Sequence, residues 1–408
     1  MHSQQSNKER LDRIAIISVH GCPIARLGER DTGGMNVYVL QTAIELGRQG
    51  IKVDVFTRVH DPNDEQITEL GPNARVIHLK AGAYRENKND LHQHIPLFVS
   101  LLQKFKESNN LKYQLIHTHY WLSGIVGSIL STRWGIPMVS NFHTLGELKL
   151  QARVGENEPE KRLTAERHIM ANADLLIATT RHERDAINYI YKIEPRDVAI
   201  IPCGVDTHLF RPLNVEECKK RLGLQNNRVI LFVGRIEPLK GLDLLLQAVA
   251  QIENPENLRL IIIGGRTENY EEISRLQDLA DTLGIKPIIQ FKGAMPQDQL
   301  PIYYNAADIC LLPSYYESFG LVALEAQACA TPVIASRVGG LPTIIQDNET
   351  GYLISGHCPE PFAEHIEMLL QNKSLRYAMG QAGRRHALEL SWEHVATSLG
   401  KAYCQLLS

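Results

Sequence analysis

The chain has 408 residues, which is too long for one ordinary domain and suits two domains of about 200 residues each. Hydrophobic residues make up 44% and charged residues 22%, a globular composition that excludes a disordered or low-complexity chain. Lys and Arg number 43 against 46 for Asp and Glu, which gives a formal net charge of −3. This even balance excludes a dedicated nucleic-acid-binding protein, which would carry an excess of basic residues.

The cysteines and the N-terminal segment indicate a soluble protein of the cytoplasm. The chain has 7 cysteines, an odd number, and none of them form a C-x-x-C pair. We therefore expect free thiols in a reducing compartment rather than disulfides or a zinc ribbon. Residues 1–13 are polar and lack the apolar core of a secretory signal. No apolar run approaches the roughly 18 residues that span a bilayer, so we expect no transmembrane segment.

Short apolar runs rich in β-branched residues alternate with longer amphipathic segments along the chain. This alternation predicts βαβ units, which give an α/β protein with parallel sheets and helices on both faces. In the first half we predict a helix over 36–48 and strands at 14–19, 52–57, 74–79, 115–118, 138–142, 175–179 and 198–202. In the second half we predict helices over 241–250, 319–329 and 391–407, and strands at 228–233, 258–263, 287–291, 309–312 and 332–335.

A turn-rich stretch at 203–212 lacks periodicity and separates the two series of elements. We therefore predict two doubly wound, Rossmann-like domains, at 1–203 and 204–390, followed by a C-terminal helical segment at 391–408. Such folds bind ligands at the carboxyl ends of their strands. Two of them in tandem would face each other across a central cleft.

A pair of glycines opens the first predicted helix, at Gly33 and Gly34, with Asn36 close behind. A backbone without side chains can approach a phosphate closely, and a helix N-terminus presents free N–H groups to it. The loop is neither a G-x-G-x-x-G fingerprint nor a P-loop, which disfavours a dehydrogenase or an NTPase. A phosphate contact and a plain tight turn both stay open as interpretations.

Two cations, Arg235 and Lys240, follow the first strand of the second half. Ligands bind at this place in a doubly wound domain. An arginine can hold a diphosphate by two hydrogen bonds, and a lysine can act as a point charge. The alternative is a solvated basic turn.

Two carboxylates, Glu317 and Glu325, stand eight residues apart, about two helical turns, around the start of an apolar helix. Glu325 lies among apolar residues, so its carboxylate needs a polar partner, and a sugar hydroxyl is a suitable one. Glu317 precedes the helix, whose N-terminal amides can bind a phosphate. The alternative is an acid at a helix start together with a solvated glutamate.

Cations, hydroxyls and a histidine in the first half form a second candidate set. Singly, each is more typical of a structural role, but together they could hold a phosphorylated acceptor. The alternative is that Arg162 pairs with Glu166 one helical turn later and that Lys88 is merely exposed. The set is His20, Lys88, Tyr120, Thr144, Lys149 and Arg162.

The histidine pairs are the remaining candidates for metal ligands. His117 and His119 can share a face of a strand, but no third ligand is evident nearby in the sequence. His92 and His94 lie in a helical stretch, where this spacing does not bring two side chains together. We therefore expect no metal site.

These motifs resemble those of the retaining, family 4 nucleotide-sugar glycosyltransferases, which have the GT-B fold. The segment from Glu317 to Glu325 resembles the family's E-x7-E motif, and Gly234–Arg235 with Lys240 resembles its diphosphate clamp. The resemblance runs from Ile14 to the final helix. In that family the final helix crosses back onto the first domain, as the amphipathic segment 391–407 would.

Two subfamilies are most similar. One makes glycosides of D-inositol 3-phosphate, and the segments 33–38, 119–124 and 142–145 resemble its pattern. The residues that bind the acceptor phosphate in that subfamily have counterparts at Lys88, Tyr120, Thr144 and Arg162. The other is sucrose-phosphate synthase, which uses fructose 6-phosphate and resembles 143–149 and 162–166. That group usually has Gln where this chain has Met35 and Ser where it has Thr144, so the first subfamily is favoured.

The resemblance implies a retaining hexosyltransferase of carbohydrate metabolism, which uses a UDP-sugar and a phosphorylated small-molecule acceptor. It implies catalytic roles for His143, Glu317, Arg235 and Lys240. It implies nucleotide-sugar contacts for Gly34, Asn36, Arg235, Lys240, Glu317, Ser318, Phe319, Gly320 and Glu325. It implies acceptor contacts for His20, Lys88, Tyr120, Thr144, Lys149 and Arg162.

The family generally works without a cofactor or an essential metal, although divalent ions are reported for some members. A nucleotide-sugar 2-epimerase and a non-catalytic sugar-nucleotide binder are the alternatives of other classes. A non-catalytic protein is disfavoured because four residues with distinct roles in the reaction are all present: Arg235, Lys240, Glu317 and Glu325. The donor's base and sugar, the identity of the acceptor and the oligomeric state stay open, a homodimer among the options.

Overall fold

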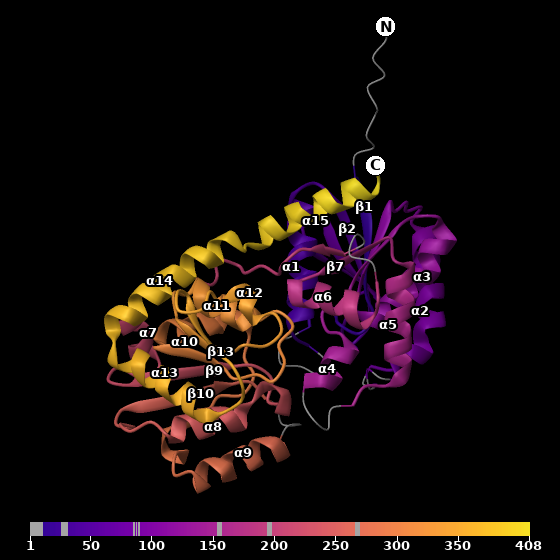
Figure 1. The fold of residues 1–408 in the computed structure, drawn as a ribbon. Helices are drawn as coiled ribbons and strands as arrows, with labels where there is room; N and C mark the ends of the chain where they lie inside the picture. Colours follow the sequence, from indigo (N-terminus) through magenta and orange to yellow (C-terminus); the bar gives the residue numbers. More distant parts are fainter. Residues whose placement is uncertain are drawn as a thin grey trace.

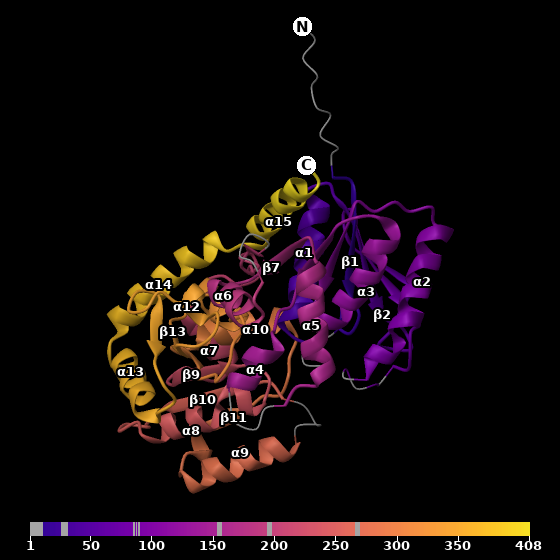
Figure 2. The same cartoon turned by 45° about the vertical axis from the view of Figure 1, so that its right-hand side comes forward.

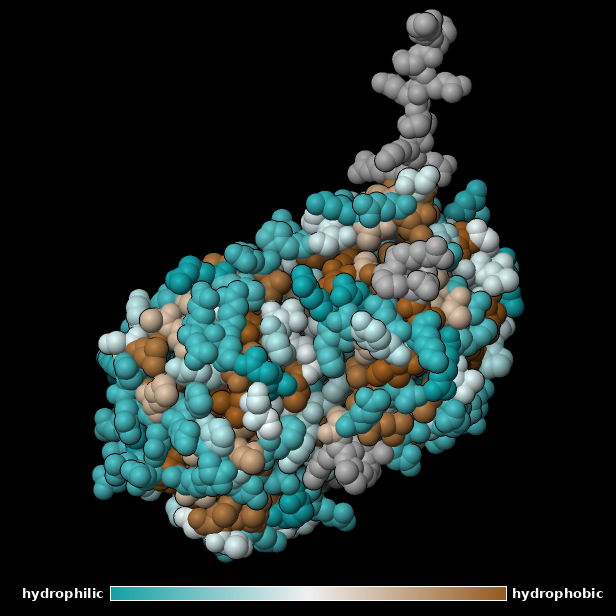
Figure 3. Space-filling model, viewed as in Figure 1, coloured by the Kyte–Doolittle hydropathy of each residue, from teal (hydrophilic) through white to brown (hydrophobic). Residues whose placement is uncertain are grey.

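Two β-sheets lie side by side in this computed structural model, and a long run of C-terminal helices extends over both of them (Figure 1). The structure describes residues 11–25, 32–84, 86, 88, 90–152, 157–193, 198–265 and 270–408. Among these residues no helix is long and apolar enough to cross a membrane. Hydrophilic side chains cover most of the face in Figure 3, and apolar ones form separate small groups.

The first sheet, counted over the described residues, has eight strands in the order β3-β4-β2-β1-β5-β6-β7-β8. The strands are β1 (Arg13–Ser18), β2 (Lys52–Arg58), β3 (Ile67–Gly71), β4 (Ala74–Leu79), β5 (Leu115–His119), β6 (Met138–Asn141), β7 (Leu175–Ala178) and β8 (Val198–Ile200). They pair in parallel, apart from β3, which is antiparallel to β4 at the edge. The helices of this half are α1 (Gly34–Arg48), α2 (Ile95–Ser108), α3 (Tyr120–Trp134), α4 (Gly146–Ala152), α5 (Glu160–Asn172) and α6 (Arg181–Ile190).

The second sheet has six parallel strands in the described part of the chain, in the order β11-β10-β9-β12-β13-β14. The strands are β9 (Arg228–Val233), β10 (Leu258–Ile263), β11 (Ile289–Phe291), β12 (Ile309–Leu312), β13 (Val333–Ser336) and β14 (Gly351–Ile354). The helices are α7 (Val215–Arg221), α8 (Leu242–Ala250), α9 (Tyr270–Thr282), α10 (Leu300–Ala306), α11 (Leu321–Ala328), α12 (Leu341–Ile344), α13 (Pro359–Gln371), α14 (Lys373–Glu389) and α15 (Trp392–Leu406).

The central strands are apolar on both faces because each sheet lies between two layers of helices. In β1, Ile14 and Ile16 belong to a core with residues of α1 and α15, whereas Ala15 and Ile17 belong to a core with residues of α2 and α3. The strands predicted from apolar runs are all confirmed to within a few residues. The edge strands β3 and β14 were not predicted.

Helix α15 joins the end of the chain to the first sheet. Figures 1 and 2 show it lying next to α1 after α14 has run along the second half. Its buried side chains include Val395, Leu399 and Tyr403, which recur at helical spacing. The hydroxyl of Tyr403 lies 2.7 Å from Nδ1 of His117 in β5, a hydrogen bond that spans most of the sequence. The final helix therefore crosses back onto the first half of the chain, as the sequence led us to expect.

Candidate active site

Loops from the carboxyl ends of both sheets meet where the two halves are in contact. Gly34, at the start of α1, faces Leu321, the first residue of α11, and a Cβ added at Gly34 would lie 3.0 Å from Leu321 Cδ1. A Cβ added at Gly340 would lie 2.8 Å from Thr180 Cγ2, so a second pair of loops also touches. Facing strand ends are where doubly wound domains bind ligands.

Lys240 and Glu317, predicted from separate motifs, form an ion pair in this region. Nζ of Lys240 lies 2.7 Å from Oε2 of Glu317, and both side chains are largely buried. Arg235 lies on the same loop after β9 but pairs with Glu237, at 3.0 Å, and is mostly exposed to solvent. Each cation of the predicted diphosphate clamp is therefore next to a carboxylate.

A glycine lets the lysine loop approach the glutamate loop. Gly241 has φ +67°, and a Cβ there would lie only 2.0 Å from the carbonyl oxygen of Pro313, so a larger residue would push the loops apart. The backbone N–H of Tyr315 donates to the carbonyl of Leu239 over 2.8 Å. These contacts fix Lys240 next to the segment that carries Glu317.

A second glycine pair, Gly339 and Gly340, supports Glu317 from the other side. Gly339 has φ +52°, and a Cβ there would lie 1.9 Å from the carbonyl oxygen of Glu317. The N–H of Gly340 donates to the same oxygen over 2.9 Å. This pair was not predicted from the sequence, although a glycine pair at the start of a helix was the signal used at Gly33 and Gly34.

The segment between the two predicted carboxylates turns into α11. The Ser318 hydroxyl bonds to the Tyr316 hydroxyl over 3.3 Å, and Phe319 is buried. Gly320 is the N-cap of α11 with φ +105°, and no side chain caps the helix. The first-turn N–H groups therefore have no side-chain acceptor at the N-cap position.

Glu325 lies on α11 with both carboxylate oxygens hydrogen-bonded. Oε1 accepts from Gln297 Nε2 over 2.8 Å, and Oε2 accepts from the Tyr304 hydroxyl over 2.7 Å. Burial raises the pKa of Glu325 to about 7, and the two hydrogen bonds oppose that rise. The carboxylate does have polar partners, as its apolar neighbours required, but Gln297 and Tyr304 were not predicted.

Asn36 holds the glycine loop of the first half in shape. Its Nδ2 donates to the carbonyl of Cys22 over 2.8 Å, and its Oδ1 accepts from the N–H of Gly33 over 3.1 Å. The side chain is buried. The structure thus gives Asn36 a positioning role next to Gly34, and a direct nucleotide-sugar contact of Asn36 stays a prediction.

His143 lies in a strained turn after β6. Its φ is +59°, rare for a residue with a side chain, and its N–H donates to Asn141 Oδ1 over 2.9 Å. Its Nε2 lies 2.9 Å from Nδ1 of His119, a partner that the sequence analysis considered only as a metal ligand. Burial lowers the pKa of His143 to about 3, so the imidazole is neutral at neutral pH.

Arg162 is a buried hub among the residues predicted for the acceptor. Its guanidinium donates to Glu166 over 2.7 Å and to Glu158 over 2.8 Å. It also donates to the carbonyl of Thr144 over 2.7 Å and to its hydroxyl over 3.1 Å, and it lies over the ring of Tyr120. The pairing with Glu166 that we gave as the alternative is therefore present, together with contacts to two predicted acceptor residues.

The other predicted acceptor residues lie around this hub. The rings of His20 and Tyr120 are 4.4 Å apart. Burial, together with the nearby charges of Lys88 and Arg162, lowers the pKa of His20 to about 3. Lys149 donates to Glu158 over 2.9 Å, and this carboxylate also binds Arg162. The structure thus brings the six residues into one neighbourhood.

Comparisons with known proteins agree with this arrangement. Residues 32–209 match the family described as Glycosyltransferase Family 4, and residues 214–386 match Glycosyl transferases group 1. The chain is 40% identical to the D-inositol 3-phosphate glycosyltransferase of Corynebacterium efficiens, over 96% of this chain and 95% of that one. It is 39% identical to the enzyme of the same name from Rhodococcus jostii, over 97% and 90%. A sucrose-phosphate synthase from Thermosynechococcus elongatus superposes with a TM-score of 0.90 at 36% identity, over 97% and 99%.

Proposed function

Because the chain belongs to the family 4, group 1 glycosyltransferases and has their GT-B fold, we propose that it transfers a hexosyl group from a UDP-sugar to a phosphorylated polyol such as inositol phosphate, with retention at the anomeric carbon. The observation that carries the proposal is the ion pair between Lys240 and Glu317, 2.7 Å long, at the facing strand ends. It brings together a cation for the leaving diphosphate and a carboxylate for the donor sugar.

In the proposed reaction the acceptor hydroxyl attacks the anomeric carbon on the face from which the diphosphate leaves. The bond from the anomeric carbon to the phosphate oxygen breaks, and its electron pair stays on that oxygen. The proton of the acceptor hydroxyl passes to the departing phosphate. The protein then needs no nucleophile of its own, and it contributes by positioning both substrates and by stabilising charge.

The residues divide between the two substrates in this proposal. Lys240 and Arg235 exchange their carboxylate partners for the diphosphate, whose charge grows as it leaves. Glu317 accepts from hydroxyls of the donor sugar, and Glu325 accepts from the ribose. His143, which is neutral, contacts the donor sugar near the anomeric centre. The first half, 1–203, then holds the acceptor, and 204–390 hold the donor.

The phosphorylated acceptor is supported by the neighbourhood of Arg162 and by the names of the relatives. Lys88, Lys149 and Arg162 supply positive charge there, while Tyr120 and Thr144 supply hydroxyls. A second candidate is sucrose-phosphate synthase activity, favoured by the close structural likeness to an enzyme of that name. Both acceptors carry a phosphate on a polyhydroxylated ring, which the same charges would recognise.

The donor and the compartment complete the proposal. A UDP-sugar agrees with the ligand of HepE from Anabaena, a protein of the same fold that was solved with UDP-glucose. The odd number of cysteines supports the reducing cytoplasm as the compartment.

The test is a matrix of UDP-, ADP- and GDP-sugars against inositol phosphate, fructose 6-phosphate and their unphosphorylated forms. Released nucleotide and product mass are measured, and the anomeric configuration of the product is read by NMR. We expect one UDP-sugar and one phosphorylated acceptor to react, with the α-configuration of the donor kept. Nucleotide release that needs no acceptor would instead favour an epimerase or a hydrolase. Equal use of the free acceptors would reject the phosphate site.

A further inference from the structure

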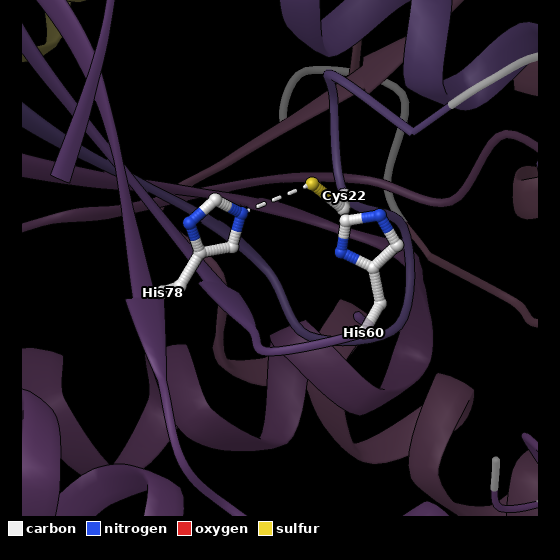
Figure 4. Close-up of side chains that lie close together, drawn as sticks. All are labelled: Cys22, His60 and His78. Atoms are coloured by element: carbon white, nitrogen blue, oxygen red, sulfur yellow. Dashed lines mark hydrogen bonds between the residues drawn. The ribbon is translucent and has the colours of Figure 1, made fainter. Parts of the chain in front are cut away.

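A cluster of metal-ligand side chains lies at the carboxyl ends of three adjacent strands in the first sheet. Cys22 comes shortly after β1, His60 comes shortly after β2, and His78 lies in β4. One ligand-type atom from each of the three residues lies within 4.8 Å of the other two. Figure 4 shows the three side chains converging from separate segments. Their wide separation in sequence is why no metal motif was predicted.

The distances between these atoms fall on either side of those between neighbouring ligands around one small cation. Sγ of Cys22 lies 3.3 Å from Nε2 of His78. Oδ2 of Asp64 lies next to this group, 4.0 Å from that Nε2 and 2.7 Å from Nδ1 of His60, and it accepts from the backbone N–H groups of His60 and Asp61. Around a tetrahedral zinc ion with Zn–N of about 2.0 Å and Zn–S of about 2.3 Å, neighbouring ligand atoms are roughly 3.3–3.7 Å apart. The observed distances bracket that range.

The orientation of His78 is that of a metal ligand. Its Nδ1 lies 2.7 Å from the carbonyl oxygen of Glu65, and because a carbonyl can only accept, Nδ1 carries the hydrogen. The lone pair of the neutral ring is then on Nε2, which faces Cys22. A backbone carbonyl that fixes the tautomer in this way is the usual second partner of a metal-bound histidine.

His60 contributes a buried nitrogen without a hydrogen bond. Its Nδ1 is close to Asp64, yet the two atoms are not aligned for a hydrogen bond, and the structure gives this nitrogen no hydrogen-bond partner among the described residues. The side chain of His60 is 28% exposed, whereas that of His78 is fully buried, so an ion could reach the cluster past His60.

We propose that Cys22, His60 and His78 bind a divalent zinc-type cation with a structural role, and that the neighbouring Asp64 completes the set as the fourth ligand when the ion binds. A thiolate and a carboxylate would balance the two positive charges, and two neutral imidazoles would complete four-coordination. Binding would release the thiol proton of Cys22 to solvent. Four protein ligands leave no open position for substrate or water, so the ion takes no part in the transfer reaction.

The ion would fix the loop that leads to the candidate active site. The backbone carbonyl of Cys22 accepts from the side chain of Asn36, which in turn accepts from the N–H of Gly33. A metal on the Cys22 thiolate would therefore hold one end of a chain of hydrogen bonds that reaches the glycines before α1. In the absence of an ion, a thiol–imidazole hydrogen bond and a His60–Asp64 ion pair would account for the same four side chains.

The experiment uses the full chain without a polyhistidine tag, purified under reducing conditions. Bound metal is measured by plasma mass spectrometry after dialysis. The chelated protein is then titrated with Co²⁺, whose near-ultraviolet charge-transfer band reports a thiolate ligand. The variants are Cys22→Ser and His60→Gln, and the controls are Cys358→Ser and Cys404→Ser, which change exposed cysteines. Circular dichroism verifies that each variant is folded.

We expect stoichiometric zinc and a Co²⁺–thiolate band in the wild type and in both control variants. Cys22→Ser should lose the band. Both site variants should lower the affinity for metal by more than roughly 100-fold, because losing a direct ligand weakens binding more than losing a hydrogen bond that supports a ligand. Metal content that is equal in the wild type and in the site variants would overturn the proposal. A chelated wild type that gives no thiolate band with Co²⁺ would also overturn the proposal.

If Cys22→Ser does not fold, the wild-type titration and the His60→Gln variant still test the proposal. None of these readouts depends on glycosyl transfer, so their failure is distinct from a failure of the proposed function.

Discussion

Lys240 donates from Nζ to Oε2 of Glu317 over 2.7 Å and so joins the loop after β9 to the loop after β12. The two side chains are only 16% and 21% exposed, so solvent screens the pair less than it would a surface ion pair. The lysine is therefore already in place before a diphosphate arrives, which reduces the reorganisation needed during the reaction.

Replacing Lys240 by Ala should lower kcat by roughly 100- to 1,000-fold, the usual effect of removing one preorganised group that stabilises transition-state charge. Nucleotide binding should weaken as well, because the diphosphate is charged in the ground state too. Steady-state kinetics and titration calorimetry measure the two effects. Lys286→Ala, which removes an exposed lysine, is the control. Wild-type turnover in Lys240→Ala would remove this residue from the mechanism.

Affinity for the UDP-sugar should fall as the pH drops through about 7, because Glu325 must be ionised to accept from two ribose hydroxyls and its pKa is raised to that value by burial. The intact UDP-sugar is the right ligand, since its diphosphate has no terminal phosphate to titrate nearby. Calorimetry over a pH series should show this dependence in the wild type and in Glu317→Gln. Glu325→Gln should bind weakly at every pH, and a retained pH dependence would contradict the ribose assignment.

Lys88→Ala should raise KM for the phosphorylated acceptor by about 10-fold, which corresponds to one charge-assisted hydrogen bond of roughly 1.5 kcal/mol. KM for the donor should not change. Lys88 is a better probe than Arg162, because Arg162→Ala would leave the buried Glu166 without its cation. Lys104→Ala on α2 is the control. An unchanged preference for phosphorylated over free acceptor would place the phosphate elsewhere.

Tyr403→Phe should destabilise the protein by about 1 kcal/mol, because it leaves Nδ1 of His117 buried without its partner. The midpoint of urea unfolding measures the loss. Tyr377→Phe on α14 removes a hydroxyl from a tyrosine that is 70% exposed and should change nothing. Equal stability of the two variants would show that the hydrogen bond does not hold α15 to β5.

Stability should decrease as the pH falls below about 6.5. Burial holds the pKa values of His20, His117 and His143 at about 3 in the folded chain, while the unfolded chain takes up protons from the ordinary value of 6.5 downwards. Between pH 6.5 and about 3, each such histidine lowers the free energy of unfolding by up to roughly 1.4 kcal/mol for each pH unit. Urea unfolding over a pH series should show a shallower slope for His117→Asn than for the wild type. Parallel slopes would mean that His117 is protonated in the folded protein.

The central strands could be predicted from the sequence because both of their faces are buried. Ile14–Ile17 and Val229–Val233 are continuous apolar runs, and the structure has the strands β1 and β9 over those residues. The edge strand β3, Ile67–Gly71, is exposed or half-buried along its whole length. It therefore lacks the apolar signal, and only its pairing with β4 makes it a strand.

The parts of the candidate site that lie within one segment could also be predicted. Glu317 and Glu325 are spaced along one turn and helix, and Arg235 and Lys240 share one loop, so their relation depends on local geometry alone. The partners of Glu325 could not be predicted in this way. Gln297 and Tyr304 reach it from another helical region, and nothing in the local pattern of either segment specifies that contact.

The sequence by itself determined two α/β halves, the final helix and the motifs at the strand ends, because these depend on short-range periodicity and spacing. Only the tertiary structure decided that the guanidinium of Arg162 is shared among Glu158, Glu166 and Thr144. Likewise, only the order of β1, β2 and β4 in the sheet brings Cys22 to His78. Such contacts depend on how distant segments pack, and a side chain's chemical type does not reveal which distant group it will meet.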